Sequence, residues 1–400
     1  MLHQAPKDMA AVKACATIPR EPLKRASALM RKVIERRNTI PVLSYLKVEI
    51  APGHVTLSGT DLDIELTVEI EAETEGAATF MVAERVFAGF APGAAGPVVM
   101  QLMPGKVARD QECMDRISLS DGETSLTLNA HMPAEEFPHL KPNGGAKVQP
   151  TFTLSQTEVV RLFKLGRHCV STELTRYYLN GTFLTTNPDT GTLRAVTTNG
   201  HKLARIDTEE PADFGALKGD DRKGLIVAAK AVDLLLNIAG KGGNEPVAFS
   251  CAEYFLCAEV AGTTLRAKTI DGTYPDYTRV IPSPSDNLVA HLSGAALSRM
   301  ARAAKVIVPQ LVNPVKLDFE TGRIGFDNSH SDDGASFVMP LQCRLAEGCS
   351  SKSIGFNLAY LRQQGDITPT FKLSTAGEGE PALIHSDDPN ALWVVMPMRL

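Results

Sequence analysis

Basic side chains gather in three stretches of this chain, although its 400 residues sum to a formal net charge of −5. Residues 23–37, 157–170 and 294–308 together carry twelve Lys or Arg and two Glu, a net charge of +10. The rest of the chain therefore carries −15. Charge sorted in this way predicts one surface that binds a polyanion on a body that repels it. The alternative is a solvated face without a ligand, which is the commoner meaning of a charge run.

The sequence lacks the motifs of common enzyme classes. Residues 105–107 (GKV) do not complete a Walker A loop, and neither HExxH nor GxSxG occurs. Asp61 and Asp63 would suit a metal-dependent nuclease, but the alternation around them places Asp63 on the polar face of a strand and Asp61 in its turn. His201 has no partner carboxylate that would make it a general base. We therefore predict a non-catalytic protein with no metal and no other cofactor.

Length and composition indicate several domains with reduced thiols. Four hundred residues suit about three domains of roughly 150 residues. The seven cysteines are odd in number and form no CxxC pair, which favours free thiols in a cytosolic protein. Lys7, Lys13 and two prolines interrupt the start of the chain, and no apolar run reaches the roughly 18 residues of a membrane span. We therefore expect a cytoplasmic location.

The three basic stretches recur about one third of the chain apart, and each has apolar residues at helical spacing. A second, less charged helix is predicted in each third, at residues 82–90, 228–239 and 357–364. Residues 62–70 alternate between apolar and polar types, which predicts a strand with one buried face. Each third is therefore α+β, with two helices on one face of a mostly antiparallel sheet.

Turn patterns and linkers divide the repeat into domains. Strand-turn-strand patterns centre on residues 59–61, 199–201 and 328–334, and Pro- and Gly-containing linkers occupy residues 141–150 and 282–286. The predicted domains are residues 1–148, of which 1–13 form an extension, then 149–284 and 285–400. The same spacing could also arise by chance in a long α+β chain.

Two such chains joined head to tail would enclose a ring lined by about twelve helices. At roughly 10 Å per helix, the ring would measure about 120 Å around and leave a hole of roughly 28 Å. A hole of that size admits duplex DNA with a layer of water. Its basic lining would contact phosphates without reading sequence. Closure would also cover sheet edges that otherwise invite aggregation.

Several segments, in order along the chain, resemble the bacterial DNA polymerase III beta sliding clamp family. The resemblance spans about residues 14–400 and includes the end of the chain. The matching segments are residues 36–43 (RRNTIPVL), 60–63 (TDLD), 176–181 (RYYLNG), 198–204 (TNGHKLA), 271–280 (DGTYPDYTRV), 354–360 (IGFNLAY) and 394–400 (VVMPMRL).

This resemblance implies a head-to-tail homodimeric ring that encircles duplex DNA and acts as a processivity factor of DNA polymerase III in DNA replication. It implies a clamp loader that opens the ring and places it on DNA. It also implies partners that dock through short peptides containing Gln and Leu or Phe: replicative and translesion DNA polymerases, ligase and mismatch-repair proteins.

The end of the chain is expected to close the peptide pocket. Pro397 lacks the N–H that a central strand position needs, so we expect the tail to leave the sheet and cross a surface groove. Met396 and Met398 would suit several peptide sequences. The alternative is a final strand that completes the core. The pocket implied by the resemblance contains Leu179, Thr198, Gly200, His201, Lys202, Leu203, Pro275, Arg279, Val280, Asn357, Tyr360, Val394, Val395, Met396, Pro397, Met398, Arg399 and Leu400.

The resemblance also implies DNA contacts and a dimer interface. Tyr177 and Tyr178 match family positions that contact duplex, although both also suit ordinary strand aromatics. The predicted DNA contacts are Arg37, Arg176, Tyr177 and Tyr178, with diffuse contacts from Lys24, Arg31, Lys32, Arg161 and Arg302. The interface would place Leu126 and Leu128 of one chain against Lys305 and Val306 of the other.

Four residues depart from the family pattern. Asn199 stands where Asp is usual, and Lys202 stands where Arg is usual. Glu173 lies near the predicted duplex contacts, and Lys305 falls in an interface segment that is usually apolar. We therefore predict a divergent member of the family. The alternative function is a clamp-like adaptor that binds peptides but does not encircle DNA.

Overall fold

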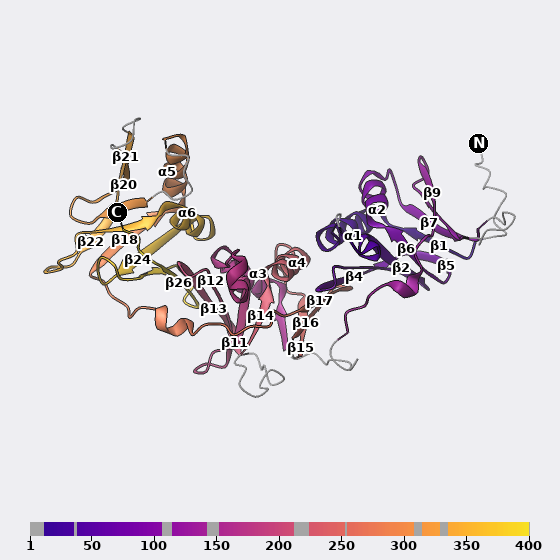
Figure 1. Ribbon diagram of the computed structural model, residues 1–400, viewed down its shortest axis with the longest axis horizontal. Helices are drawn as coiled ribbons and strands as arrows, with labels where there is room; N and C mark the ends of the chain where they lie inside the picture. Colours follow the sequence, from indigo (N-terminus) through magenta and orange to yellow (C-terminus); the bar gives the residue numbers. More distant parts are fainter. Residues whose placement is uncertain are drawn as a thin grey trace. The chain divides into compact units, whose positions relative to one another are not determined.

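The computed structural model describes residues 12–35, 38–105, 114–141, 152–211, 224–252, 254–307, 314–328 and 335–399 (Figure 1). The chain forms two compact units. The first unit contains Met1–Gln156 and Asp233–Thr269, and the second contains Thr157–Val232 and Ile270–Leu400. Both units contain helices and antiparallel sheets, as the predicted α+β class requires. The division into three domains stays a prediction, and its boundary at residue 148 lies outside the described residues.

The first unit contains two antiparallel sheets. Its strands are β1 (Ala14–Ile18), β2 (Tyr45–Ala51), β3 (His54–Thr60), β4 (Ile64–Glu71), β5 (Glu73–Gly76), β6 (Ala78–Ala83), β7 (Val98–Met103), β8 (Arg116–Ser120), β9 (Ser125–Asn129), β10 (Phe152–Ser155), β15 (Pro246–Ala252), β16 (Phe255–Val260) and β17 (Thr263–Lys268). The strand orders are β5-β1-β7-β8-β9 and β10-β15-β16-β17-β4-β3-β2-β6. Pairing of Leu265 with Leu66 joins β17 to β4, so segments far apart in the sequence share one sheet.

The second unit is also built on two antiparallel sheets. Its strands are β11 (Gly181–Thr186), β12 (Thr192–Thr198), β13 (Lys202–Pro211), β14 (Gly224–Ala228), β18 (Leu288–Ser293), β19 (Pro314–Asp318), β20 (Arg323–Asn328), β21 (Ala335–Pro340), β22 (Gln342–Leu345), β23 (Ser353–Asn357), β24 (Thr370–Thr375), β25 (Ala382–His385) and β26 (Ala391–Val395). The orders are β14-β11-β12-β13-β26-β25-β24-β18-β22 and β21-β20-β19-β23.

An α-helix occurs at each of the six predicted positions. The helices are α1 (Arg20–Val33), α2 (Glu84–Phe90), α3 (Gln156–Lys164), α4 (Ala229–Ala239), α5 (Gly294–Ile307) and α6 (Leu358–Ile367). The predicted end of α1 at residue 37 is wrong, because Ile34 adopts an extended conformation with φ −74° and ψ 125°. The predicted end of α3 at residue 170 is also wrong. The buried Gly166 packs against Thr197, whose hydroxyl donates to Gly166 O at 2.8 Å, and a 3-10 helix (Arg167–Cys169) follows.

The amphipathic pattern of the first helix decides which face meets the sheet. The large apolar side chains of α1 (Leu23, Leu29, Met30 and Val33) are buried, and the helix contacts β3 and β4. Lys24, Arg25, Arg31 and Lys32 are exposed. In α5, Leu297 and Met300 are buried whereas Arg299 and Arg302 are exposed. The cations named here therefore lie on helix faces turned away from the packed core.

The turn before β4 explains why this strand starts later than predicted. Leu62 lies in the turn with φ +78°, and the strand begins at Ile64. Thr60 Oγ1 donates to Ile64 O at 2.8 Å and accepts the Leu62 N–H at 3.1 Å. Asp61 Oδ1 accepts the N–H groups of Asp63 and Ile64 at 3.0 and 2.7 Å. Asp61 is therefore a turn residue, as predicted.

Within the described ranges, no helix has the length and apolar character to cross a membrane. No three His, Cys, Asp or Glu side chains in those ranges gather as a metal site would require. The cysteines that the structure describes have free thiols: Cys15, Cys169, Cys251, Cys257, Cys343 and Cys349.

Candidate partner-binding site and nucleic-acid interface

The last strand of the chain lies inside a sheet, and the tail then leaves it. Strand β26 pairs with β13 on one side and β25 on the other, and it ends at Val395. The Met396 N–H donates to His201 O at 2.8 Å, and the Met398 N–H donates to Gly355 O at 2.9 Å. Pro397, which has no N–H, lies between these two anchors. The tail therefore leaves the sheet as predicted, and its Leu400 lies outside the described residues.

The turn that receives the tail is held by its own side chains. Thr198 Oγ1 donates to Lys202 O at 2.8 Å and accepts the Gly200 N–H at 3.1 Å. Asn199 Oδ1 accepts the N–H groups of His201 and Lys202 at 3.0 and 3.1 Å. Residues 60–64 make the same four bonds, so the predicted repeat extends to individual hydrogen bonds. Asn199 supplies the acceptor that Asp61 supplies there.

The backbone conformation of Gly200 favours glycine at the tip of this turn, which also lies close to Arg176. The φ of Gly200, +87°, lies in the left-handed region, which favours glycine. A Cβ at this position would also lie 2.7 Å from Arg176 Nη1. The turn thus brings Arg176, a predicted DNA contact, beside the predicted peptide pocket.

Lys202 connects this turn to α6. Its Nζ donates to Gln363 Oε1 and lies 4.9 Å from the centre of the Tyr360 ring. The His201 ring stacks on Tyr360 at a centroid distance of 6.2 Å. Burial lowers the pKa of Lys202. Gln363 is absent from the predicted pocket, although a position three residues after Tyr360 shares its helix face.

Several residues predicted to line the pocket are parts of the core beneath it. Leu179, Leu203 and Val394 are each at most 3% exposed and belong to one buried cluster with Tyr274. Thr198, Lys202 and Val395 are buried as well. Asn357 caps α6 by accepting the Ala359 N–H at 2.9 Å. These side chains support the site, and they offer a ligand little surface.

Only some of the residues predicted to line the pocket are accessible to a ligand. Gly200, His201, Pro275, Arg279, Val280 and Arg399 are exposed, and Tyr360, Met396, Pro397 and Met398 are half-buried. Val280, in the 3-10 helix Tyr277–Val280, is 44% exposed. Asp276 fixes the start of that helix by accepting the Thr278 N–H at 3.1 Å. The accessible surface combines apolar side chains with Arg279 and Arg399 as donors.

Not all predicted DNA contacts offer a free charge. The side chain of Arg161 is 16% exposed, and its guanidinium donates to both carboxylate oxygens of Asp388 at 2.8 and 2.9 Å. It also donates to Glu158 Oε1 and to Asp207 O at 2.8 Å. Two carboxylates therefore pair with Arg161 within the second unit, so a phosphate would compete with Glu158 and Asp388 for its guanidinium, and its contact with DNA stays a prediction.

The Arg176–Tyr178 segment presents aromatic and apolar surface. It lies in Leu174–Leu179, two 3-10 turns that join at a kink at Arg176, so the expectation of ordinary strand aromatics is wrong. Arg176 binds Glu173 through two hydrogen bonds of 2.8 and 2.6 Å, and this bond lowers the pKa of Glu173. Tyr177 is 52% exposed and meets the half-buried Tyr178 edge-on. Arg37, the fourth predicted contact, lies outside the described residues.

The predicted dimer interface includes a sheet edge with which no described strand pairs. Strand β9 pairs with β8 and ends its sheet. Leu126 and Leu128 are half-buried and alternate with exposed residues, so both point to one face. Lys305 and Val306 lie in the last turns of α5, and their side chains are outside the described part of the chain.

Comparison with known proteins identifies similar chains along nearly the whole length. Two family models match: the DNA polymerase III beta subunit, N-terminal domain, over residues 16–141, and its central domain over residues 153–276. The beta sliding clamp of Caulobacter vibrioides (strain NA1000 / CB15N) is 30% identical over 392 residues, 96% of this chain and 99% of the relative. The beta sliding clamp of Pseudomonas aeruginosa is 27% identical over 394 residues, with the same coverage of both chains.

Solved structures agree with these matches. A sliding clamp (DNA polymerase III subunit beta) from Bartonella birtlesii, bound to griselimycin, is similar with a TM-score of 0.83 at 26% identity, covering 96% of this chain and 99% of that one. A beta sliding clamp from Caulobacter crescentus has a TM-score of 0.82 at 26% identity, covering 97% and 99%.

Proposed function

The chain belongs to the DNA polymerase III beta subunit family and is a DNA sliding clamp, and we propose that its exposed helix cations face DNA while its C-terminal tail binds partner peptides. A clamp is a non-catalytic processivity factor in DNA replication. Its partners are DNA, a polymerase and a second copy of the chain. Because the DNA that it encircles is in the bacterial cytoplasm, we place its work there.

One observation carries the DNA-binding proposal: the cations of α1 and α5 are exposed opposite the buried faces of those helices. Lys24, Lys32 and Arg302 form no ion pair with any residue that the structure describes. Arg31 approaches a carboxylate at 4.0 Å and keeps 46% of its side chain exposed. Such cations attract phosphates through long-range charge and do not read base sequence, which suits a protein that slides.

Two copies would form the ring head to tail. The support is the open edge of β9, where Leu126 and Leu128 are incompletely covered. We propose that the α5 end carrying Lys305 and Val306 in the second copy covers this surface. An unpaired sheet edge is an aggregation hazard, and closure of the ring would remove it.

The peptide surface would serve several partners in turn. We propose that a clamp loader, replicative and translesion polymerases, ligase and mismatch-repair proteins use the surface around Val280, Tyr360, Met396 and Met398. Support comes from its half-buried methionines, which adapt to different apolar side chains. Arg279 and Arg399 would donate hydrogen bonds to carbonyl or carboxylate oxygens at its border.

A topological experiment tests the proposal. The protein is loaded by a clamp loader onto nicked circular DNA, which is then linearised. We expect retention on circles and loss from linear ends. Peptide binding without topological retention would instead identify an adaptor that does not encircle DNA. A persistent monomer in solution would also reject the ring.

A further inference from the structure

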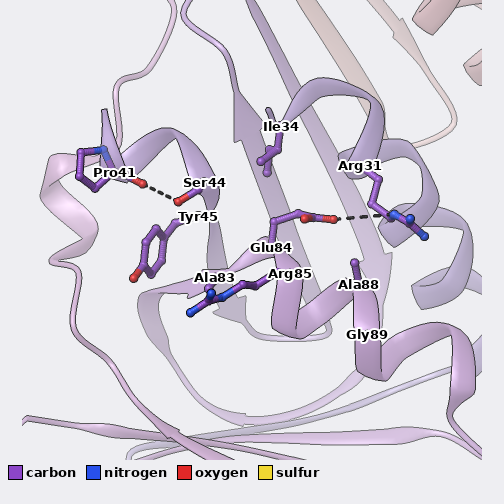
Figure 2. Close-up of a pocket in the computed structure, with 10 residues that line it drawn as sticks. All are labelled: Arg31, Ile34, Pro41, Ser44, Tyr45, Ala83, Glu84, Arg85, Ala88 and Gly89. Carbon is purple, nitrogen blue, oxygen red and sulfur yellow. Dashed lines mark hydrogen bonds and ion pairs between the residues drawn. The ribbon is translucent and has the colours of Figure 1, made fainter. Parts of the chain in front are cut away.

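A pocket of about 590 Å³ lies in the first unit between α1, α2 and the 3-10 helix Pro41–Ser44. Figure 2 shows Glu84 between the two α-helices with its carboxylate pointing toward Arg31. Tyr45 lines the pocket on the side away from Arg31, and Arg85 extends toward it. A volume of this size falls in the roughly 300–1,000 Å³ range of small-ligand sites.

Glu84 is the unusual group in this pocket. The residue is 3% exposed, and its Oε1 has no hydrogen-bond partner among the described residues. Arg31 Nε approaches Oε1 to 4.0 Å, which is too long for a hydrogen bond. A buried carboxylate oxygen without a donor is costly, so a ligand that supplies a donor would be stabilised there.

At the border of the pocket, two arginines favour an anionic group of the ligand, whereas Glu84 favours a hydrogen-bond donor. Arg31 and Arg85 are exposed, and both guanidiniums can bind phosphate oxygens. Tyr45 is half-buried and offers a ring on which a base can stack. A ligand that satisfies all four side chains has a phosphate, a flat ring and an N–H donor. A nucleotide has these three parts.

We propose that this pocket binds one unpaired DNA nucleotide whose base carries an exocyclic amino group. Glu84 accepts an amino hydrogen, Tyr45 stacks on the base, and Arg31 and Arg85 bind the flanking phosphates. The proposal rests on the clamp function, since Arg31 belongs to the helix whose other cations face DNA. A strand that contacts Lys24 and Lys32 therefore passes close to the pocket.

The chemistry of Glu84 sets the base preference. A carboxylate only accepts hydrogen bonds, and the amino group of cytosine donates to carboxylates in known complexes. Thymine has no amino group, and its ring N–H lies between two carbonyl oxygens that repel a carboxylate. One charge-assisted hydrogen bond corresponds to about a tenfold preference for cytosine over thymine.

Fluorescence anisotropy with the full-length protein tests this preference. Labelled single-stranded octamers of deoxycytidine and deoxythymidine are compared, and unlabelled dCMP serves as competitor. We expect about tenfold tighter binding of the cytosine octamer. Equal affinities would overturn the proposal. Competition by dCMP at the octamer's own concentration would show a free-nucleotide site and overturn the assignment to a DNA strand.

Two variants separate recognition from folding. Glu84→Gln can both donate and accept, so it should bind both octamers with similar affinity. Arg85→Ala should weaken both octamers and keep their ratio. Glu21→Gln is the matched control, because Glu21 is an exposed glutamate of the same helix as Arg31. An unchanged preference in Glu84→Gln would overturn the proposal. Retention of the wild-type ring on circular DNA is measured separately, so failure of the pocket and failure of the clamp are distinguishable.

Discussion

Lys202 donates a hydrogen bond to Gln363, and its ammonium lies 4.9 Å from the centre of the Tyr360 ring. The contact joins β13, which pairs with the last strand, to α6. Lys202 is 6% exposed, so its charge has lost most of its water and depends on these two partners. The base of the predicted peptide site is therefore a buried polar contact on an otherwise apolar core.

A double-mutant cycle can test whether Lys202 and Gln363 interact directly. Gln363→Leu should lower the free energy of unfolding by about 2 kcal/mol, because it leaves a buried ammonium without its acceptor. Lys202→Met should cost less, since the thioether fills the space without a charge. The double variant should resemble Lys202→Met. Urea unfolding measures all three, and Gln363→Glu, which keeps an acceptor, is the control. Additive losses would contradict a direct interaction.

His168 should make the stability of the protein dependent on pH. Its Nε2 lies 3.1 Å from Gln364 Oε1, and burial lowers its pKa from 6.5 to about 4. As pH falls from 6.5 to about 4, the unfolded chain binds a proton that the folded protein does not. The free energy of unfolding should therefore fall in this window, by up to about 3 kcal/mol.

The variant His168→Gln should remove this contribution, because glutamine does not titrate. Urea unfolding of both proteins at about pH 7 and about pH 5 measures the difference. The carboxylates affect both proteins alike and cancel in the comparison. Parallel stability curves for the two proteins would contradict the role assigned to His168.

Replacing two kinds of basic residue should have different effects on the salt dependence of DNA association. The double variant Lys24→Ala and Lys32→Ala should reduce the salt slope of DNA association by about 2, since each phosphate contact contributes about 0.9. Arg161→Ala should leave the slope unchanged. It should instead lower the free energy of unfolding by about 2 kcal/mol, because Asp388 and Glu158 lose their partner. The reverse pattern would show that Arg161, and not α1, contacts DNA.

Removal of residues 396–400 should separate peptide binding from folding. The deletion loses the Met396 and Met398 hydrogen bonds but leaves β26 intact to Val395. We expect affinity for a Gln- and Leu-containing peptide to fall at least about thirtyfold, as for the loss of a binding hot spot. Sedimentation should show an unchanged dimer. Arg399→Ala, which keeps the apolar tail and loses one border donor, should lose less affinity than the deletion, and a monomeric deletion variant would show a structural tail.

Local sequence predicted those features that depend on neighbouring residues. The turns at 60–64 and 198–202 could be placed because their Thr, Asp and Asn side chains bond to backbone a few residues away. The helix positions followed from apolar spacing. The end of α3 did not, because the contact of Gly166 with Thr197 joins residues that are distant in the chain.

Sequence alone determined the α+β class, the repeated turns and the helices that carry the basic residues. Tertiary structure decided what each basic residue does. Arg161 and Lys24 are alike as members of basic helices, but Asp388 lies beside Arg161 and neutralises it, whereas Lys24 stays exposed. Folding likewise buried Lys202 and left Glu84 Oε1 without a donor among the residues that the structure describes. The reason is physical: charge type is a property of the residue, but its partner and its exposure to water depend on segments that meet only in the folded chain.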